Sequence, residues 1–296
     1  MTTKCRQQEE FQRLAFASLS EYFQEHADEV IEIEILPPAI QPPDGITMQD
    51  GMSLGVPKKI LALAYLEARQ HFFVHSKAHD PITAAQTLQA TKVMLLFDPE
   101  HLTAANYRKR TLFQLKEAHG LHVGTPYHRA LRQELCFLNS ILTSPLHRQS
   151  KSPTLWYHRF SIVDSLRLIE LGDASQEQIA TFWESEFAAI YKSGEQHPKN
   201  YHAWQYARRL VSKLDSSEMV DHVTHGVKDW CCRHPSDISG WSFLLYLMPI
   251  VATSLQRELL LESYREDLKD TNRRPIALDR VCNAIAWIQA HQESSV

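Results

Sequence analysis

A proline followed at a fixed distance by a tryptophan recurs in this chain, and this pattern limits the possible folds more than any other feature. Pro198 comes six residues before Trp204, and Pro235 comes six residues before Trp241. Proline is favoured in the first turn of a helix, because that turn leaves its N–H groups unbonded and the φ of proline is already helical. A large indole in the same place of successive helices indicates helical hairpins that bury their faces against one another.

Two further copies of the pattern are less regular. Ala105 stands six residues after Pro99, in the place of the tryptophan, and Trp156 follows Pro153 by only three residues. Positions 105, 156, 204 and 241 are 51, 48 and 37 residues apart, which suits one helical hairpin plus loops of variable length. Chance is the alternative explanation in a chain with 14 prolines. The shared offset favours a true repeat, and we expect all four prolines to begin helices.

Helical periodicity extends over most of the chain. Glycine is scarce, with nine residues, and helix-forming residues are plentiful, which leaves few positions for turns. We expect helices at residues 57–76, 80–97, 101–118, 127–143, 153–171, 175–193, 199–214, 216–233, 237–250, 253–269 and 276–291. These patterns predict an all-α fold, a right-handed solenoid or crescent of antiparallel helical hairpins.

The N-terminal part has a different pattern. Apolar residues at helical spacing predict a helix over Phe11–Phe23, and the alternation in Val30–Leu36 predicts either a strand or an extended segment. Five prolines and three glycines in Leu36–Pro57 predict a loop. We therefore divide the chain into residues 1–56, an N-terminal helix plus a proline-rich extended segment, and residues 57–296, a helical-hairpin domain whose repeats cover about 85–250.

Composition and cysteine usage favour a cytoplasmic protein. The formal charge is −4, from 31 basic and 35 acidic residues, so no basic field indicates nucleic-acid binding. The five cysteines are odd in number and form no CxxC pair, which is typical of a reducing compartment. The sequence has neither the apolar core of a signal peptide nor an apolar run long enough to span a membrane.

Motifs for other kinds of site are weak. His71 and His75 share a helix face but lack the glutamate of a His-Glu-x-x-His zinc motif, and the side chains of the adjacent Cys231 and Cys232 point apart. The sequence contains no phosphate-binding loop, no dinucleotide fingerprint and no hydrolase elbow. We therefore expect no metal site in this chain and no self-contained nucleotide or hydrolase site.

The amino-acid sequence of the repeats resembles that of protein prenyltransferase α subunits. Pro198–Gln205 reads Pro-Lys-Asn-Tyr-His-Ala-Trp-Gln and resembles the signature of the α-subunit repeat. Thr103–Lys109, Leu155–Arg159 and Ser239–Leu244 are similar to further copies, and together these segments cover about residues 85–250. The wide spacing and the long N-terminal part look most like the divergent branch known as prenyltransferase α-subunit repeat-containing proteins.

The resemblance implies a helical crescent that wraps a partner. In the family, the β subunit is an α–α barrel that holds the catalytic zinc and most of the isoprenoid pocket, so zinc is expected in the partner and no cofactor in this chain. The implied activity is transfer of farnesyl or geranylgeranyl from its diphosphate to a protein cysteine. It would require the heterodimer, with the isoprenoid diphosphate bound at the shared interface.

The same resemblance assigns roles to residues. Lys199 and Tyr201 match the lysine and tyrosine of the motif and are the expected catalytic residues, because an ammonium and a phenol hydroxyl would stabilise the charge that grows on the leaving diphosphate. Asn200 and His202 are candidates for substrate binding, and packing is the alternative for His202. The residues expected to hold neighbouring hairpins together are Asn106, Arg108, Trp156, His158, Arg159, Trp204, Arg208 and Trp241.

Two departures from the family motif motivate an alternative function. Ala207 stands where the motif has arginine, and Arg208 follows it. Because each helical residue turns by about 100°, Arg208 points to a different neighbour. Ala105 replaces the first tryptophan. The main hypothesis is an α-type subunit of a protein prenyltransferase, and the alternatives are a non-catalytic helical-repeat scaffold that binds a protein partner and a tetratricopeptide-like peptide-binding adaptor.

Overall fold

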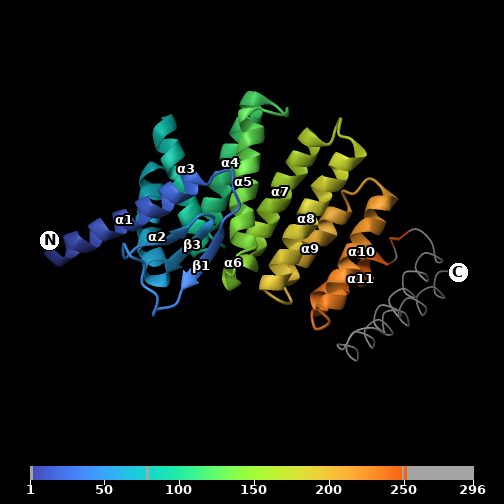
Figure 1. The fold of residues 1–296 in the computed structure, drawn as a ribbon. Helices are drawn as coiled ribbons and strands as arrows, with labels where there is room; N and C mark the ends of the chain where they lie inside the picture. The colour runs from blue at the N-terminus through green and yellow to red at the C-terminus, as the bar shows by residue number, and fades with distance from the viewer. Residues whose placement is uncertain (1–2, 78–79, 249, 252–296) are drawn as a thin grey trace. The chain divides into compact units, whose positions relative to one another are not determined.

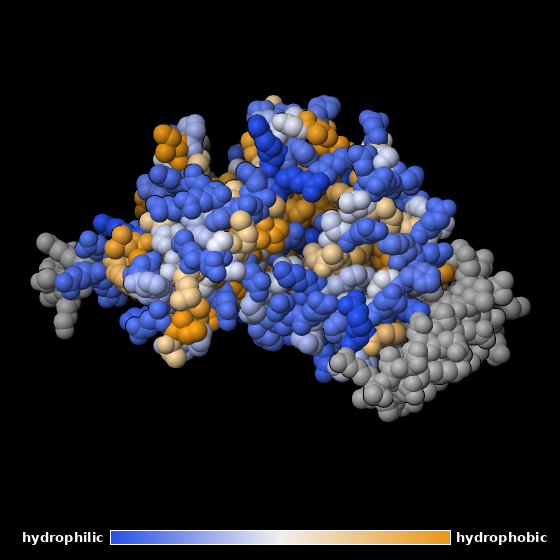
Figure 2. All heavy atoms as spheres, viewed as in Figure 1, coloured by the Kyte–Doolittle hydropathy of each residue, from blue (hydrophilic) through white to orange (hydrophobic). Residues whose placement is uncertain are grey.

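A computed structural model describes residues 3–77, 80–248 and 250–251 (Figure 1). The chain forms two compact units that divide between Ile179 and Ala180. Helices dominate both units, so the prediction of an all-α helical-repeat fold is confirmed. None of the described helices is long and apolar enough to cross a membrane. The face drawn in Figure 2 is mostly hydrophilic, with apolar side chains gathered in smaller patches between polar ones.

The first unit contains the long N-terminal helix α1 (Thr3–Glu25), which packs on α2 (Lys58–His75) and α3 (Pro81–Phe97). Its remaining helices follow in chain order as α4 (Leu102–His119), α5 (Pro126–Leu142), α6 (His147–Ser150) and α7 (Pro153–Glu170). Helix α8 (Gln176–Gln196) crosses the division. The second unit continues with α9 (Tyr201–Val211), α10 (Ser217–Arg233) and α11 (Ile238–Leu247).

A small sheet interrupts the helices of the first unit. It consists of β1 (Glu32–Leu36), β2 (Met48–Asp50) and β3 (Ser53–Pro57), in the order β1-β3-β2. Strand β1 runs parallel to β3, and β2 runs antiparallel to it. The strand interpretation of Val30–Leu36 is therefore confirmed. The loop predicted for Leu36–Pro57 is wrong in its last part, because the turn at Gly51 lets β2 and β3 pair with each other, and β3 also pairs with β1.

Side chains at the end of α5 hold the sheet against the helices. The hydroxyl of Ser140 accepts a hydrogen bond from the backbone N–H of Ile31 at 2.9 Å, and the hydroxyl of Ser144, just after α5, accepts one from Ile33 at 2.8 Å. Ile31 and Ile33 are buried, and a buried N–H without a hydrogen-bond partner lowers the stability of the fold. The N-terminal segment is therefore an integral part of the first unit.

The predicted helices between residues 57 and 250 are confirmed, with ends that differ by a few residues. The short helix α6 was not predicted, because four residues are too few for a helical pattern to show in the sequence. The helices predicted at 253–269 and 276–291 lie outside the described residues.

Only one of the four repeat prolines begins a helix. Pro153 is the first residue of α7, whereas Pro99, Pro198 and Pro235 lie in turns and the helix begins three residues later in each case. The prediction that all four begin helices is therefore wrong for three of them. This difference explains why the distance from the proline to the tryptophan is irregular. The tryptophan slot is the fourth residue of each of these helices: Ala105 in α4, Trp156 in α7, Trp204 in α9 and Trp241 in α11.

A side-chain cap precedes each of the same four helices. The capping residue accepts a hydrogen bond from the N–H of the third helical residue, which satisfies one of the donors that a helix start leaves unbonded. The caps are His101, Ser152, Asn200 and Asp237. The repeat thus consists of a cap, three residues and a slot for a large ring.

The indole in that slot also fixes the turn before the helix. Trp156 donates its Nε1–H to the carbonyl of Ser150 at 2.7 Å, and Trp241 donates to the carbonyl of Pro235 at 3.2 Å. In both cases the acceptor lies six residues earlier in the chain. Trp204 instead packs edge-on against Trp230, with ring centroids 4.9 Å apart.

Arginines of the repeat are buried in the first unit and bind polar groups of α5. Arg108 forms a bidentate pair with Glu134, and the Nε2–H of His158 donates a further hydrogen bond to Glu134 Oε1, 2.8 Å away. Burial by itself raises the pKa of the Glu134 carboxyl, but the charge of Arg108 and the contact with His158 outweigh it and hold this pKa well below its usual range. Arg159 donates to the Asn139 side-chain oxygen at 2.9 and 3.1 Å.

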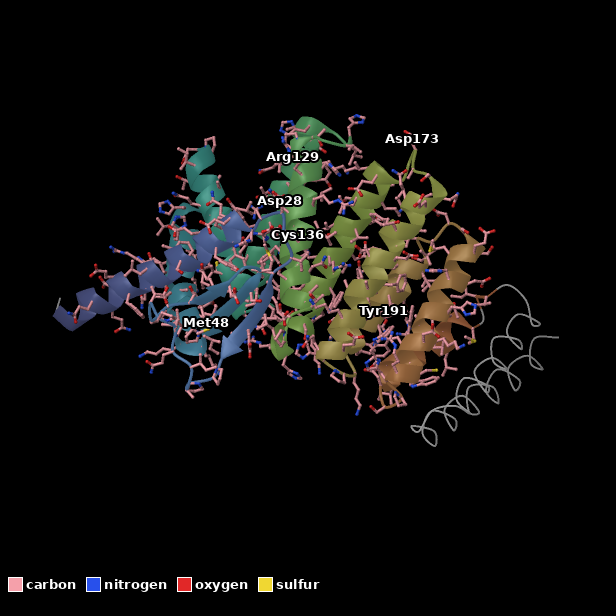
Figure 3. The ribbon with its side chains drawn as sticks, viewed as in Figure 1. Asp28, Met48, Arg129, Cys136, Asp173 and Tyr191 are labelled. Atoms are coloured by element: carbon pink, nitrogen blue, oxygen red, sulfur yellow. The ribbon has the colours of Figure 1, made fainter. Side chains whose placement is uncertain are left out.

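Lys92 lies in the same interior. Its ammonium donates to the carbonyl of Phe23 at 3.1 Å. Burial, and then the charge of Arg108, lower the pKa of Lys92 to about 8. The charges of Glu134, Cys136 and Asp28 act to raise this pKa. Cys136 and Asp28 are labelled near each other in Figure 3. A buried ammonium with an incomplete charge balance costs stability.

Aromatic rings fill the core of the second unit. Trp204 and Trp230 are fully buried and contact Phe243 and Tyr191, the latter labelled on α8 in Figure 3. Helix α11 approaches so closely at Gly240 that an added Cβ would lie 2.7 Å from the Trp230 ring. Glycine at this position is therefore a packing requirement.

Candidate functional site

The backbone of Lys199 adopts a conformation that is rare for a residue with a side chain. Its φ is +63°, and among the described residues no other non-glycine has a positive φ. The left-handed region brings Cβ close to the following carbonyl oxygen, which costs about 1–2 kcal/mol. The surrounding structure must therefore hold Lys199 in place, and strained backbone of this kind is concentrated at functional sites.

Asp237 is the residue that holds it. One carboxylate oxygen, Oδ2, accepts a hydrogen bond from the backbone N–H of Lys199 at 2.5 Å. The other, Oδ1, accepts from the N–H groups of Ser239 and Gly240 and caps α11. Asp237 is only 2% exposed, so this carboxylate rigidly joins the start of α11 to the turn that carries Lys199.

The side chains on either side of this anchor point outward. Lys199 is exposed, and Tyr201, the first residue of α9, is 58% exposed. The ring of His202 lies edge-on to that of Tyr201, with centroids 5.4 Å apart, and is half-buried. An ammonium and a phenol hydroxyl thus stand two residues apart at one helix start, where both can donate to an anion.

Asn200 lies between them and points inward. It is fully buried, its Oδ1 caps α9 through the N–H of Ala203, and its Nδ2 donates to the hydroxyl of Ser193 at 3.0 Å. These contacts favour a role in orienting the helix start rather than the direct substrate contact predicted for Asn200. The alternation of an outward Lys199, an inward Asn200 and an outward Tyr201 follows from the turn and the cap.

Arg208 contacts a neighbour that differs from those of the other repeat arginines. It donates to the carbonyl and the hydroxyl of Ser242 on α11, at 3.0 and 2.9 Å, and lies over the ring of Tyr246. Partial burial lowers its pKa, and Tyr201 and Tyr246 act to raise it. Ala207 occupies the slot of the buried arginine and is fully buried itself. The one-residue shift thus moves the charge from the interior to the junction of α9 and α11.

Most of the other repeat residues belong to the first unit. Asn106 is exposed on α4, and Arg108, Trp156, His158 and Arg159 belong to the first unit described above. Within the described part of the chain, no three His, Cys, Asp or Glu side chains come together as a metal site. The rings of His71 and His75 pack at a tilt with centroids 4.6 Å apart, and burial, followed by the charge of His75, lowers the pKa of His71.

Sequence reasoning missed Asp237, which is the central residue of the site. A signal for it was present: an aspartate followed by Ile-Ser-Gly-Trp is typical of a helix cap. The second carboxylate contact, with Lys199, joins residues 38 positions apart in the chain and has no local signature.

Comparison with known proteins finds similarity to two groups of proteins. A family model described as the ECM9 middle domain matches residues 155–271, a range that includes the Lys199 turn and its Asp237 anchor. Protein ECM9 of Saccharomyces cerevisiae is 25% identical over 185 residues, which cover 62% of this chain and 45% of that protein.

Two further relatives carry prenyltransferase names. The geranylgeranyl transferase type-2 subunit alpha of Candida albicans is 26% identical over 130 residues, covering 44% of this chain and 32% of the relative. The protein prenyltransferase alpha subunit repeat-containing protein 1 of Danio rerio is 22% identical over 180 residues, covering 56% of this chain and 38% of the relative. The chain therefore spans less than half the length of each of the three relatives.

Proposed function

We propose that this chain is a divergent α-type subunit of a protein prenyltransferase, which its similarity to two relatives with prenyltransferase α-subunit names supports. In this proposal it pairs with a β subunit, and the heterodimer transfers a farnesyl or geranylgeranyl group from its diphosphate to a protein cysteine. The chain contributes the Lys199 turn to the shared site and is not active alone.

The observation that carries the proposal is the strained, anchored backbone of Lys199. A lysine needs no left-handed backbone in order to stay in solvent, and glycine would fit this turn at lower cost. Asp237 nevertheless fixes the position, and the ammonium stands beside the exposed hydroxyl of Tyr201. A fixed pair of donors directed outward is suited to an anion that belongs to a bound partner or substrate.

The proposed chemistry needs such a pair. The acceptor thiolate forms a bond to C1 of the isoprenoid while the bond from C1 to the diphosphate oxygen breaks, and negative charge moves onto the departing diphosphate. Lys199 would stabilise this charge with its ammonium, and Tyr201 would donate a hydrogen bond to the same group of oxygens. Removing one donor from such a site typically lowers the rate by about 10²-fold.

Zinc, which this proposal assigns to the β subunit, would favour the thiolate form of the acceptor cysteine. The residues of this chain act at the other end of the reaction, because they place positive charge and a hydroxyl at the leaving group. Arg208, held by Ser242 on α11, adds a second cation to the second unit.

The test begins with co-expression of the full chain with each protein prenyltransferase β subunit of the same cell. We expect one pairing to give a stable heterodimer in size-exclusion chromatography, and this complex to transfer a labelled isoprenoid to a cysteine-bearing acceptor protein. Lys199→Ala should then lower kcat by about 10²-fold, with little effect on assembly. Lys192→Ala removes another exposed lysine of the second unit and serves as the matched control.

The outcomes separate the proposal from its alternative. Transfer that is unaffected by Lys199→Ala would remove the catalytic role of Lys199. A stable heterodimer without transfer to any acceptor would instead support the non-catalytic scaffold, which fits the names of the ECM9 and repeat-containing relatives, since neither name states a transfer activity of its own. Failure to bind any β subunit would contradict both the α-type assignment and the proposed site.

A further inference from the structure

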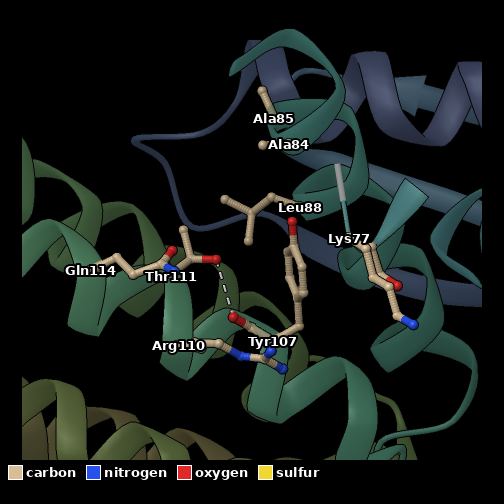
Figure 4. A pocket seen from close by; sticks show the side chains of 9 residues that line it. Lys77, Ala84, Ala85, Leu88, Tyr107, Arg110, Thr111 and Gln114 are labelled. Carbon is tan, nitrogen blue, oxygen red and sulfur yellow. Dashed lines mark hydrogen bonds between the residues drawn. The ribbon is translucent and has the colours of Figure 1, made fainter. Parts of the chain in front are cut away.

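A cavity lies in the first unit and shares no residue with the Lys199 site. Its volume is about 560 Å³, which is within the range of pockets that hold small molecules. The end of α2 and the helices α3 and α4 enclose it, and its lining is Ser76, Lys77, Ala84, Ala85, Leu88, Tyr107, Arg110, Thr111 and Gln114 (Figure 4).

The two sides of this pocket differ in chemistry. Ala84 and Ala85 on α3 are small and leave the space open, and Leu88 extends the apolar wall. Figure 4 shows Tyr107 rising from α4 with its hydroxyl near Leu88, while Lys77 and Arg110 lie on the side away from the alanines. Apolar surface and positive charge therefore face the same space from opposite sides.

The positive charge of this pocket is not balanced by the protein. Arg108 pairs with Glu134, Arg132 with Glu170 and Arg148 with Asp98. Over the described ranges, by contrast, neither Lys77 nor Arg110 has a carboxylate within ion-pair distance, and the pocket lining contains no acidic residue.

The hydroxyl of Tyr107 adds a donor. It makes no hydrogen bond to any described residue, whereas Thr111 on the next turn donates its own hydroxyl to the Tyr107 carbonyl at 3.1 Å. Burial raises the pKa of Tyr107, and the charge of Arg110 partly lowers it. Three donors, two on α4 and one in the turn after α2, thus line the same pocket.

We propose that this pocket binds a small organic anion, a phosphate ester or carboxylate with an apolar body. The anionic group lies between Lys77 and Arg110, where a guanidinium can bind two of its oxygens side by side. The apolar body lies against Ala84, Ala85 and Leu88, and Tyr107 donates to the ligand where the two regions meet. This site is independent of the proposed prenyl transfer.

The experiment measures binding of phenyl phosphate and benzoate to the full chain by isothermal titration calorimetry. We expect at least one of the two to bind, the affinity to fall with added salt, and benzyl alcohol, which lacks the charge, not to bind measurably. Arg110→Gln and Lys77→Gln should each weaken binding by about tenfold. Ala84→Leu should block it by filling the apolar side, with circular dichroism verifying that each variant is folded.

The matched control is Lys109→Gln, which removes the same charge one residue away. Lys109 lies over the ring of Tyr157 and does not line the pocket, so its loss should leave the affinity within about twofold. Equal weakening by Lys109→Gln and Arg110→Gln would show non-specific attraction and overturn the site. Absence of binding for both probes at millimolar concentration would overturn it as well.

A second arm identifies the source of the anion. Phosphatidylcholine vesicles with and without phosphatidic acid present the same phosphate ester on a lipid surface. Co-sedimentation that needs phosphatidic acid and is lost in Arg110→Gln supports the site with a lipid headgroup as ligand. Binding of phenyl phosphate without co-sedimentation supports the site with a free small molecule as ligand.

Discussion

Replacing Lys199 by glycine should stabilise the protein. The positive φ of Lys199 costs about 1–2 kcal/mol, because its Cβ crowds the next carbonyl oxygen. Glycine removes this cost but gives the unfolded chain more freedom, which offsets about 0.4–1 kcal/mol. The hydrogen bond to Asp237 comes from the backbone N–H and survives the substitution. The net gain for Lys199→Gly is therefore between about 0 and 1.6 kcal/mol, with a central value of about 0.8 kcal/mol.

Urea unfolding followed by tryptophan fluorescence measures this gain. Trp204 and Trp230 are buried in the second unit and report its unfolding, which matters because two compact units need not unfold in one step. A stabilised variant shifts the midpoint upward at an unchanged slope. Lys199→Ala keeps the strain and loses the same exposed side chain, so its free energy of unfolding should stay within about 0.5 kcal/mol of the wild type.

A second glycine variant should change the free energy of unfolding in the opposite direction. Lys192 is an exposed residue inside α8 with ordinary helical backbone, so Lys192→Gly should lose about 1 kcal/mol. The strain argument predicts opposite signs for the two glycine substitutions. If Lys199→Gly destabilises the second unit as Lys192→Gly does, or matches Lys199→Ala, the backbone of Lys199 is not strained and the argument fails.

Three further predictions concern the interior. Glu134→Gln should cost about 3–5 kcal/mol in urea unfolding because it leaves a buried guanidinium without its counter-charge, whereas Asp98→Asn at an exposed pair should cost under about 1 kcal/mol. Gly240→Ala should lose about 1–3 kcal/mol in midpoint measurements, since its Cβ would lie 2.7 Å from an indole ring; Gly172→Ala, with open space around it, is the control. Lys92 has a pKa of about 8 when folded and 10.5 when unfolded, so the unfolded chain holds more protons between these values and stability from this group rises with pH; the wild type should gain up to about 2 kcal/mol over Lys92→Met from pH 8 to pH 9.5.

The repeat could be predicted from the sequence because its signals are local. A cap, a turn proline and a large ring within seven residues follow directly from the needs of a helix start. The distance from the proline to the tryptophan slot varies between copies, whereas the distance from the cap does not. Counting from Ser152 and Asn200 places Trp156 and Trp204 at the same step, so the irregular copy becomes regular.

The buried polar contacts could not be predicted in the same way. Glu134 stands among ordinary polar residues of α5, and nothing in its neighbourhood distinguishes it from an exposed glutamate. Its burial depends on Arg108 and His158, which come from two other helices. The pairing of β1 with β3 likewise depends on a return of the chain after a long stretch of loop and turn, because parallel strands have no local hairpin signature.

The choice of lysine at a left-handed position connects the stability of the second unit to its proposed function. Folding alone favours glycine or asparagine at that backbone position, and the N–H that Asp237 binds is present in any of these residues. In the proposed function, the lysine side chain contributes through its charge. If the proposed role is right, Lys199→Gly makes the heterodimer more stable and a slower transferase at once, since strain and activity then have the same origin. A variant that gains stability while transfer continues at the wild-type rate would separate the two and leave the ammonium without a role in the reaction.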